Sequence, residues 1–220
     1  MSYKSVTLIG ATGLIGNHLL EFLINDSDIS SIKILLRKPI NFNHPKVCSV
    51  VLDFANQSAY KSAIEGSDIV FCAIGTTNAK MNGDKSAYRK VDYDIPVHAA
   101  QYCKEIGCSQ FAFVSSIGAD SKHTNFYLKL KGEVEEAITA MEIPSVYIFC
   151  PSLLLGKRKE FRLGESIGKF MIKPLSFLFP SSMKPIQAST VAKSMLKATK
   201  IETKGPTRYY YKEMLELANR

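Results

Sequence analysis

Hydrophobic residues follow two alternating patterns along the chain. Short runs rich in Val, Ile and Phe are typical of strands buried on both faces of a sheet, and the segments between them carry apolar residues at helical spacing. The predicted strands are Ser5–Ile9, Ile32–Leu36, Val47–Leu52, Asp68–Ala73, Phe111–Ser115 and Ser145–Cys150, and the predicted helices are Leu14–Ile24, Ala55–Glu65, Ala87–Glu105 and Phe126–Met141. Buried strands that alternate with helices predict an α/β fold with a parallel sheet covered on both faces.

Right-handed crossovers between such strands give a Rossmann-type doubly wound sheet. The pattern changes after Pro151, where residues 157–185 mix basic and apolar stretches with Gly and Pro. A helix over Thr190–Lys200, a strand over Thr207–Tyr211 and a helix over Lys212–Ala218 are predicted beyond it. A length of 220 residues fits one domain. We expect a core over residues 1–156 and a small C-terminal segment, residues 157–220, that caps the substrate side of the sheet.

The first predicted strand runs into the sequence GATGLIG at residues 10–16. Gly10 permits a tight turn, Gly13 allows the backbone to approach a pyrophosphate, and Gly16 allows the helix to pack against the sheet. The following helix N-terminus offers free N–H groups to phosphate oxygens. Because the motif lies between a strand and a helix, it predicts a dinucleotide site. A glycine turn without a ligand is the alternative.

The second predicted strand ends in Arg37 and Lys38. Sites that prefer NAD usually place Asp or Glu there, to hold the ribose 2′-hydroxyl. A guanidinium instead holds a 2′-phosphate through charged hydrogen bonds. The pair therefore favours NADP(H) over NAD(H), unless both residues are only solvated surface charges.

Two further predicted strands end near the same edge of the sheet. Asp53 and Phe54 follow the third strand, where the adenine ring would lie, although a helix-capping Asp is an equally good interpretation. Ala73, Gly75 and Thr76 follow the fourth strand. Their small size would let this loop pass close to the ribose and phosphates of a cofactor.

A candidate catalytic group follows the fifth predicted strand, which ends in Ser115 and Ser116. Tyr127 and Lys131 come next, four residues apart, and therefore share one helix face, whereas Lys129 lies on another. An ammonium beside a phenol favours the phenolate. Tyr127 could exchange a proton with a substrate oxygen while hydride moves to or from nicotinamide, with Ser116 donating a hydrogen bond to that oxygen. Lys131 would also hold the nicotinamide ribose.

These motifs together resemble the atypical short-chain dehydrogenase/reductases, and among them the Tat-interacting protein family of NAD(P)H-binding proteins. The matching stretches are GATGLIG at 10–16, CAIGTT at 72–77, VDYD at 91–94, SSIGADS at 115–121, NFYLKLKGEVE at 125–135 and PSLL at 151–154. The resemblance covers roughly residues 5–215.

This resemblance implies roles for particular residues. Gly10, Thr12, Gly13, Leu14 and Ile15 would surround the pyrophosphate, and Arg37 would take the adenine-side phosphate. Pro151 and Leu153 would line the nicotinamide site. Cys150 stands where many relatives carry Arg, so a charge contact near this turn is expected to be missing. The family includes NADPH-binding regulators, so intact catalytic residues do not by themselves establish turnover.

Composition and charge narrow the remaining classes. Hydrophobic residues make up 46% of the chain, which excludes a disordered or fibrous protein. No stretch reaches the roughly 20 apolar residues of a membrane span, and no signal peptide is recognisable. The five scattered cysteines favour a reducing cytoplasmic location, and the four histidines show no metal-ligand spacing. We expect no bound metal, and either a monomer or a homodimer.

The net charge of +8 is unevenly distributed. Residues 1–156 carry 14 Lys and Arg against 15 Asp and Glu, whereas residues 157–220 carry 14 against 5. The excess, which begins at Lys157, Arg158 and Lys159, would attract an anionic substrate, a lipid surface or an acidic partner. A nucleic-acid partner is not expected, because no motif interleaves aromatic with basic residues.

The sequence thus predicts an NADP(H)-dependent oxidoreductase that acts on a carbonyl or alcohol substrate. One alternative is a regulatory protein that binds NADPH as a redox sensor and has little turnover. Another is a sugar-nucleotide-type epimerase, because the same residues can remove and return a hydride.

Overall fold

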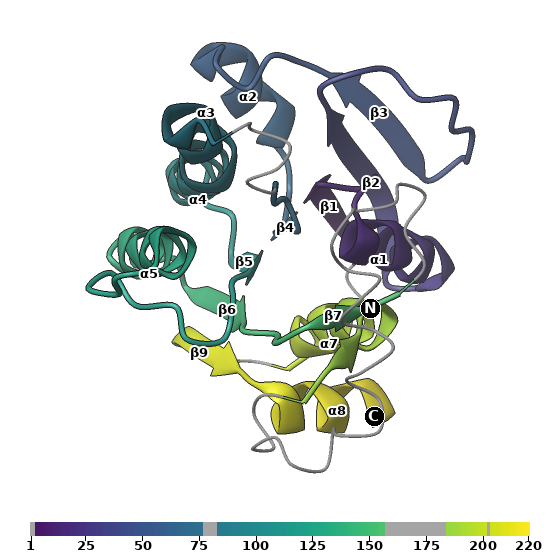
Figure 1. The fold of residues 1–220 in the computed structure, drawn as a ribbon. Helices are drawn as coiled ribbons and strands as arrows, with labels where there is room; N and C mark the ends of the chain where they lie inside the picture. The colour runs from purple at the N-terminus through teal and green to yellow at the C-terminus, as the bar shows by residue number, and fades with distance from the viewer. Residues whose placement is uncertain (1–2, 77–82, 157–183, 202) are drawn as a thin grey trace.

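A computed structural model describes residues 3–76, 83–156, 184–201 and 203–220. Seven strands form one sheet in the order β3-β2-β1-β4-β5-β6-β9, and every neighbouring pair is parallel (Figure 1). The strands are β1 (Lys4–Ile9), β2 (Ile29–Leu36), β3 (Val47–Val51), β4 (Ile69–Cys72), β5 (Gln110–Val114), β6 (Ser145–Phe149) and β9 (Gly205–Tyr209). The strand order reverses between β1 and β4, which is the doubly wound arrangement that places ligands at the carboxyl edge beside this reversal. The predicted Rossmann-type fold is therefore confirmed.

Helices cover both faces of the sheet. The helices are α1 (Leu14–Asn25), α2 (Gln57–Ile64), α3 (Lys85–Arg89), α4 (Ile95–Glu105), α5 (Phe126–Thr139), α7 (Ala188–Ala198) and α8 (Tyr211–Asn219). Side chains of α1, α7 and α8 pack in one hydrophobic cluster, and those of α2, α4 and α5 pack in another. Neighbouring residues of β1 enter different clusters, Leu8 the first and Ile9 the second, because successive side chains of a strand point to opposite faces.

The long helix predicted over Ala87–Glu105 is interrupted. Helix α3 passes into a π-helical turn, η2 (Lys90–Asp94), before α4 begins. Pro96 explains the break, because it has no N–H to donate to the carbonyl of residue 92, four positions earlier. The interruption matters because Asp92 lies within η2, with its side chain buried.

The described part of the C-terminal segment extends the sheet by one strand. Strand β9 lies along β6 as the seventh strand, and α7 packs against α1 (Figure 1). A small second sheet joins β7 (Leu154–Leu155) to β8 (Ile186–Gln187). Residues 157–183 of the proposed substrate-side cap, which include the basic residues 157–159, lie outside the described residues.

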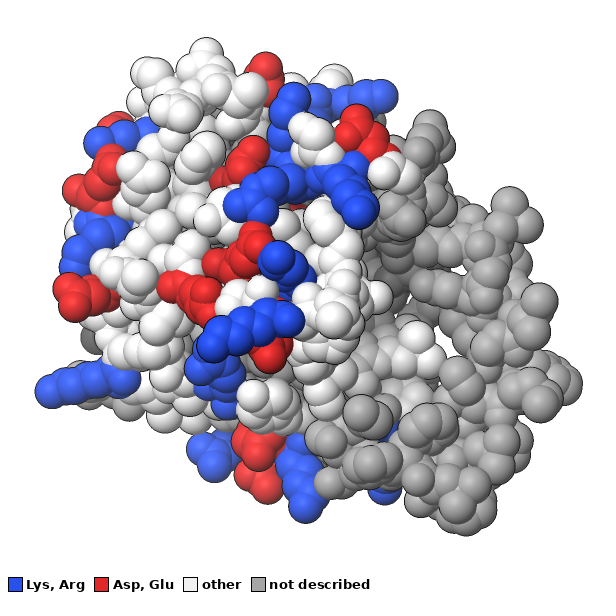
Figure 2. All heavy atoms as spheres, turned by 60° about the vertical axis from the view of Figure 1, so that its left-hand side comes forward, with Lys and Arg blue, Asp and Glu red and all other residues white. Residues whose placement is uncertain are grey.

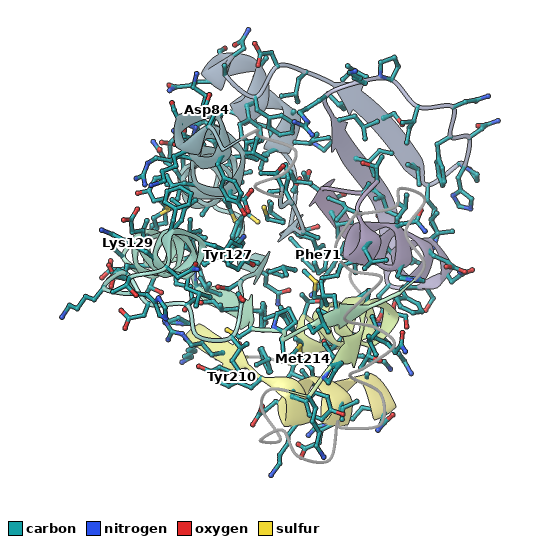
Figure 3. All side chains as sticks on the ribbon, viewed as in Figure 1. Phe71, Asp84, Tyr127, Lys129, Tyr210 and Met214 are labelled. Carbon is teal, nitrogen blue, oxygen red and sulfur yellow. The ribbon has the colours of Figure 1, made fainter. Side chains whose placement is uncertain are left out.

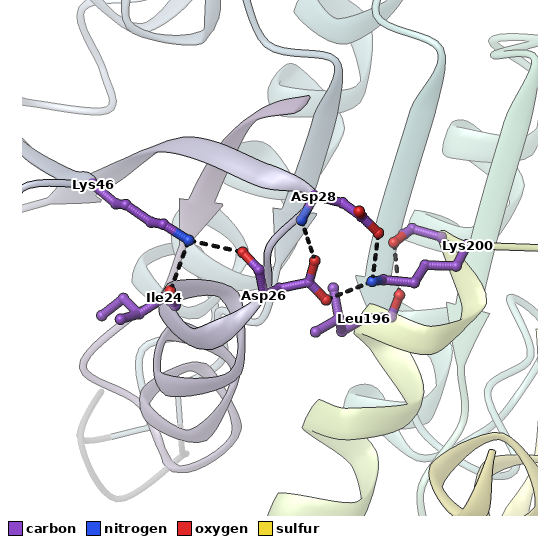
Figure 4. A network of polar contacts seen from close by, with 7 residues as sticks. Ile24, Asp26, Asp28, Lys46, Leu196 and Lys200 are labelled. Atoms are coloured by element: carbon purple, nitrogen blue, oxygen red, sulfur yellow. Dashed lines mark hydrogen bonds and ion pairs between the residues drawn. The ribbon is translucent and has the colours of Figure 1, made fainter. Parts of the chain in front are cut away.

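A polar network anchors α7 to the end of α1 (Figure 4). The Lys200 ammonium lies 2.6 Å from Asp26 Oδ2 and 2.8 Å from Asp28 Oδ2. Lys46 donates to the carbonyls of Ile24 and Asp26, at 2.9 and 2.8 Å. The helix end and the two loops beside it are therefore held by charged hydrogen bonds as well as by apolar packing.

The surface over α3, α4 and α5 mixes both signs of charge (Figure 2). Arg89 pairs with Glu133 at 2.6 Å, and Lys61 with Glu105 at 2.8 Å. On this face the charges are interspersed, so the +8 of the chain produces no broad positive patch here. None of the helices in the described residues is both long enough and apolar enough to span a bilayer.

Candidate functional site: the carboxyl edge of the sheet

The glycine turn after β1 brings backbone from two strand ends into contact. Gly10 has φ +91°, and a Cβ added there would lie 2.7 Å from the carbonyl oxygen of Ala73, after β4. A Cβ on Gly16 would lie 2.0 Å from the carbonyl oxygen of Gly10. Only glycine fits either position, so the turn folds back tightly against the start of α1.

This turn leaves the N-terminus of α1 available to an anion. Helix α1 begins at Leu14 after Gly13, and within the described residues no side chain caps it and no acidic residue lies in its first turn. Its first N–H groups therefore have no partner inside the helix and carry the positive end of the helix dipole. The side chain of Ile15 is buried in the core, so it can contribute only its N–H, whereas Thr12 is exposed. The turn fits a pyrophosphate.

Arg37 and Lys38 follow β2 directly, and both are exposed. Neither forms an ion pair with any residue that the structure describes. Their charges are thus available to a phosphate at the edge where the strands end.

The two residues predicted beside the adenine ring have other contacts. Asp53 Oδ1 accepts a hydrogen bond from the N–H of Ala55, which forms a local turn, and the N-cap of α2 is Asn56. The Phe54 ring is buried and packs edge-on against Tyr60, with 4.8 Å between ring centroids. Phe54 therefore serves the core, and Asp53 remains exposed at the edge.

A buried ion pair lies at the centre of the site. The Lys131 ammonium, on α5, is 3.3 Å from Asp92 Oδ1, and the two side chains are 4% and 1% exposed. It also lies 3.5 Å from the carbonyl oxygen of Val114 and 5.0 Å from the centre of the Phe113 ring. Burial alone would lower the pKa of Lys131, but Asp92, and next Tyr127, outweigh it, so the pKa is raised above its ordinary value. The lysine therefore stays charged.

Asp92 also fixes the loop after β4. Its Oδ2 accepts a hydrogen bond from the N–H of Thr76 at 2.8 Å. A Cβ added to Gly75 would lie 3.6 Å from Asp92 Oδ1, so the loop passes close to the carboxylate. No sequence motif had assigned Asp92 a role. The sequence did hold a signal for a buried carboxylate. Asp92 lies four residues before Pro96 in a predicted helix, and Val91 and Ile95 near it are apolar.

Tyr127 lies in the first turn of α5, one turn before Lys131. Asn125 caps this helix by accepting from the N–H groups of Tyr127 and Leu128, at 2.9 and 3.2 Å. The Tyr127 side chain is 37% exposed, and Lys129 lies on the other side of α5 (Figure 3). The structure thus combines an accessible phenol with a buried ammonium on one helix face.

The two serines after β5 have different environments. Ser115 is buried, and its hydroxyl donates to Glu135 Oε1, so its side chain is turned into the protein. Ser116 is half-buried, and its hydroxyl makes only a 3.3 Å contact with the carbonyl of Ile117. Of the pair, Ser116 is the one that could donate to a substrate oxygen.

An arginine from another strand pairs with the carboxylate beside Cys150. Arg208, on β9, donates to Glu135 Oε2 at 2.8 Å, and the Cys150 thiol lies 3.8 Å from Glu135 Oε1. Glu135 thus links the thiol of Cys150 to a charged side chain of the seventh strand. Burial raises the pKa of Cys150 to about 12, so the thiol stays protonated. Pro151 is buried, and Leu153 is 40% exposed.

The sequence profile of the NAD(P)H-binding family matches residues 10–174. The chain belongs to this NAD(P)H-binding family. It is 32% identical over 199 residues to the protein HTATIP2 of Rattus norvegicus, which covers 89% of this chain and 81% of that protein. It is 35% identical over 195 residues to the mitochondrial protein FMP52 of Debaryomyces hansenii, covering 86% of this chain and 84% of that one. The predicted membership of the Tat-interacting protein-like group is confirmed.

Solved structures support the fold of this NAD(P)H-binding chain. UDP-glucose 4-epimerase from Thermotoga maritima, in complex with UDP-glucose, superposes with a TM-score of 0.72 and 12% identity, over 98% of this chain and 81% of that one. MoeE5 in complex with UDP-glucose and NAD gives a TM-score of 0.71 and 13% identity, over 97% and 80%. At these identities the likeness concerns the fold.

The relatives correct one expectation. The predicted cytoplasmic location is wrong: the FMP52 relatives from Debaryomyces hansenii, Candida albicans and Eremothecium gossypii are all named as mitochondrial proteins. Cysteine usage gave no sign of this, because free thiols do not distinguish one reducing compartment from another.

Proposed function

We propose that this protein is an NADP(H)-dependent oxidoreductase that interconverts a carbonyl compound and an alcohol. The observation that supports it most directly is the group formed by Tyr127, Lys131 and Asp92, in which a buried, charged lysine lies one helical turn from an accessible phenol. The site lies at the edge where the glycine turn and the β4 loop meet.

The chain supplies the acid–base part of this reaction. A bound nicotinamide would supply or accept the hydride at the substrate carbon. Tyr127 donates its phenolic proton to the substrate oxygen as a carbonyl is reduced, and takes it back from an alcohol in the reverse direction. The Lys131 ammonium stabilises the phenolate that this transfer leaves behind. Ser116 donates a hydrogen bond to the same oxygen and so stabilises its developing charge.

Asp92 is the positioning residue of this proposal. It keeps Lys131 protonated by opposing the effect of burial on the lysine pKa. Through Thr76 it also holds the β4 loop at the position where the loop would border the cofactor. One carboxylate would thus couple the shape of the cofactor site to the charge of the catalytic lysine.

Our proposal of NADP(H) over NAD(H) rests on Arg37 and Lys38. Both are exposed after β2, and binding a 2′-phosphate would break no ion pair within the part of the chain that the structure describes. Arg37→Glu should weaken NADPH binding more than NADH binding, because it replaces an attraction for the 2′-phosphate by a repulsion. Fluorescence titration with both cofactors measures this, and an unchanged preference would refute the assignment.

Tyr127→Phe tests the catalytic proposal. The variant should bind NADPH like the parent protein and lose turnover by about 100-fold or more, as is typical when a general acid is removed. NADPH oxidation over a panel of aldehydes and ketones is the assay. Lys129→Met, which changes an exposed residue on the other side of α5, is the matched control and should keep full activity. NADPH binding without turnover by the parent on any substrate would favour the regulatory alternative.

We also propose that the protein resides in mitochondria, because the FMP52 relatives carry that designation. Fractionation of cells that express the tagged full chain tests this directly. Recovery of the protein in the cytosolic fraction alone would refute it.

A further inference from the structure

A pair of cysteines lies at the end of the sheet opposite the proposed active site. Helix α4 ends in a turn in which the N–H of Cys108 donates to the carbonyl of Cys103 at 2.8 Å, and the N–H of Gly107 to that of Lys104 at 3.1 Å. These two bonds, with Gly107 at φ +75°, define a Schellman motif. Its first and last residues regularly bring their side chains into contact, and here both are cysteines.

The two thiols share their surroundings. Cys103 Sγ lies 3.9 Å and Cys108 Sγ 3.5 Å from the same carbonyl oxygen, that of Gln110. Cys103 Sγ is also 3.8 Å from the carbonyl of Cys108. Both side chains are buried, and both sulfurs are free thiols. Cys72 and Cys150 are equally buried free thiols that lie on other elements.

The environment distinguishes the two sulfurs. The hydrogen bond from Cys103 lowers the pKa of Cys108, and backbone N–H groups of Gln110 and Val70 act in the same direction against the effect of burial. The same thiol–thiol hydrogen bond, together with burial, raises the pKa of Cys103. Cys108 is 3% exposed and Cys103 is fully buried, so Cys108 is the candidate to attack an oxidant and Cys103 the candidate to resolve the product.

A groove is lined by the residues that directly follow Cys108. It has a volume of about 460 Å³ and is lined in part by Ser109, Gln110, Pro144 and Ser145, at the amino ends of β5 and β6. Ser109 and Gln110 directly follow Cys108. The last turn of a helix also has the fewest backbone hydrogen bonds, so it opens more readily than the strands. Cys108 thus directly precedes two residues of the groove wall, and a local opening of this turn would expose the sulfurs to a small hydroperoxide.

We propose that Cys103 and Cys108 form a redox-active dithiol, which a hydroperoxide oxidises to an intrachain disulfide. The Cys108 thiolate attacks one peroxide oxygen, so an S–O bond forms, the O–O bond breaks, and the leaving oxygen departs as water or an alcohol after protonation. The Cys103 thiol then attacks the Cys108 sulfenic acid, forming the S–S bond and breaking the S–O bond, and its proton leaves in a second molecule of water. The two thiols lose two electrons and two protons, and the peroxide is reduced.

The test is a hydrogen peroxide titration of the full-length protein, followed by alkylation of free thiols and non-reducing peptide mapping. Trypsin cleaves after Lys104, between the two cysteines, so the disulfide joins two peptides that separate again on reduction. We expect the disulfide-linked pair of peptides, with a mass two hydrogens below the sum of the two reduced peptides. It should form at a hydrogen peroxide dose that leaves most Cys72 and Cys150 thiols unmodified. Those two cysteines control for burial alone.

Single variants give a second readout. In Cys103→Ser, Cys108 should accumulate as a sulfenic acid that dimedone traps, and in Cys108→Ser, Cys103 should stay a thiol at the same dose. The proposal is overturned if the wild-type protein gives no joined peptide, or if Cys103 and Cys108 oxidise separately at the dose that also oxidises Cys72 and Cys150. The wild-type measurement decides this even if a variant fails to fold.

Discussion

At the scale of single residues, Asp92 and Lys131 are two opposite charges that are almost completely buried in the described site. Two charges removed from water are stable only when each compensates the other, since the cost of burying either alone amounts to several kcal/mol. Sequence motifs indicated Lys131, because it stands four residues after a tyrosine. Asp92 could not be assigned in the same way, because its partner lies 39 positions away and on another helix.

Asp92→Asn should destabilise the protein by about 3–5 kcal/mol at neutral pH, because it leaves the Lys131 ammonium buried without its counter-charge. Urea unfolding of the parent and the variant measures the difference. Asp94→Asn, on the same helical turn but only half-buried, is the control and should change little. Replacing both members of the pair by apolar residues, Asp92→Leu with Lys131→Met, should recover part of the loss.

The cost of Asp92→Asn should also depend on pH. The pKa of Lys131 is raised in the folded protein, so the stability it contributes is fully present below the ordinary lysine value of 10.5 and is lost as the pH rises through the higher folded value. The gap in stability between parent and variant should therefore narrow above pH 10.5. A gap that stays constant, or widens, from neutral to strongly alkaline pH would contradict this role of the pair.

Gly10→Ala tests the close approach of the two loops. Besides the strain of φ +91°, the new Cβ would lie 2.7 Å from the carbonyl oxygen of Ala73. Gly66→Ala is a matched control, because Gly66 has φ +74° but nothing within 4 Å of the added Cβ. We expect Gly66→Ala to cost about 1–2 kcal/mol from backbone strain alone, and Gly10→Ala to cost more and to abolish NADPH binding. Equal losses of stability for the two would show that the loops do not constrain each other.

At the scale of helices and strands, hydrophobic pattern predicted the core elements to within a few residues. The central strands β4, β5 and β6 are buried along almost their whole length, so no polar face obscures their limits. The break in the helix around η2 was not predicted, although Pro96, the tenth residue of the predicted helix, is a residue that interrupts helices. The partner of Glu135 was not predicted either, because Arg208 reaches it only through strand pairing between β6 and β9.

Arg208→Met should lower the free energy of unfolding by about 1–3 kcal/mol, because it leaves the buried Glu135 carboxylate without its charged donor. The effect should be smaller than that of Asp92→Asn, since the Arg208 side chain is 42% exposed and partly solvated. Lys212→Met removes an exposed positive charge from the same part of the chain and serves as the control. Chemical denaturation of the three proteins compares them. A loss for Lys212→Met as large as that for Arg208→Met would point to net charge rather than to Glu135.

At the scale of the whole molecule, the two ends of the chain contribute to one sheet and to one hydrophobic cluster. Residues of α1 pack with residues of α7 and α8 in the same cluster, although more than 160 positions separate them. Composition and charge arithmetic divided the sequence at residue 156, where the charge balance changes. In the structure, residues from both sides of position 156 share one hydrophobic cluster, because burial depends on apolar side chains and not on net charge.

We therefore expect one cooperative unfolding transition. Far-UV circular dichroism and hydrogen exchange of the β1 and β9 amides should report the same midpoint in urea, as expected for a single two-state domain. Earlier exchange of β9 than of β1, with retained dichroism, would show instead that residues 184–220 unfold as a separate unit.

The pairing of β6 with β9 has a consequence for how the protein is made. Ser145–Phe149 is buried along its whole length, yet its outer partner, Gly205–Tyr209, lies 60 positions later in the chain. While a ribosome synthesises the intervening residues, the hydrophobic edge of β6 is open and able to pair with another nascent chain. Strand β9 therefore covers the open edge of β6. The interval before β9 emerges from the ribosome is the one in which a chaperone would be most needed.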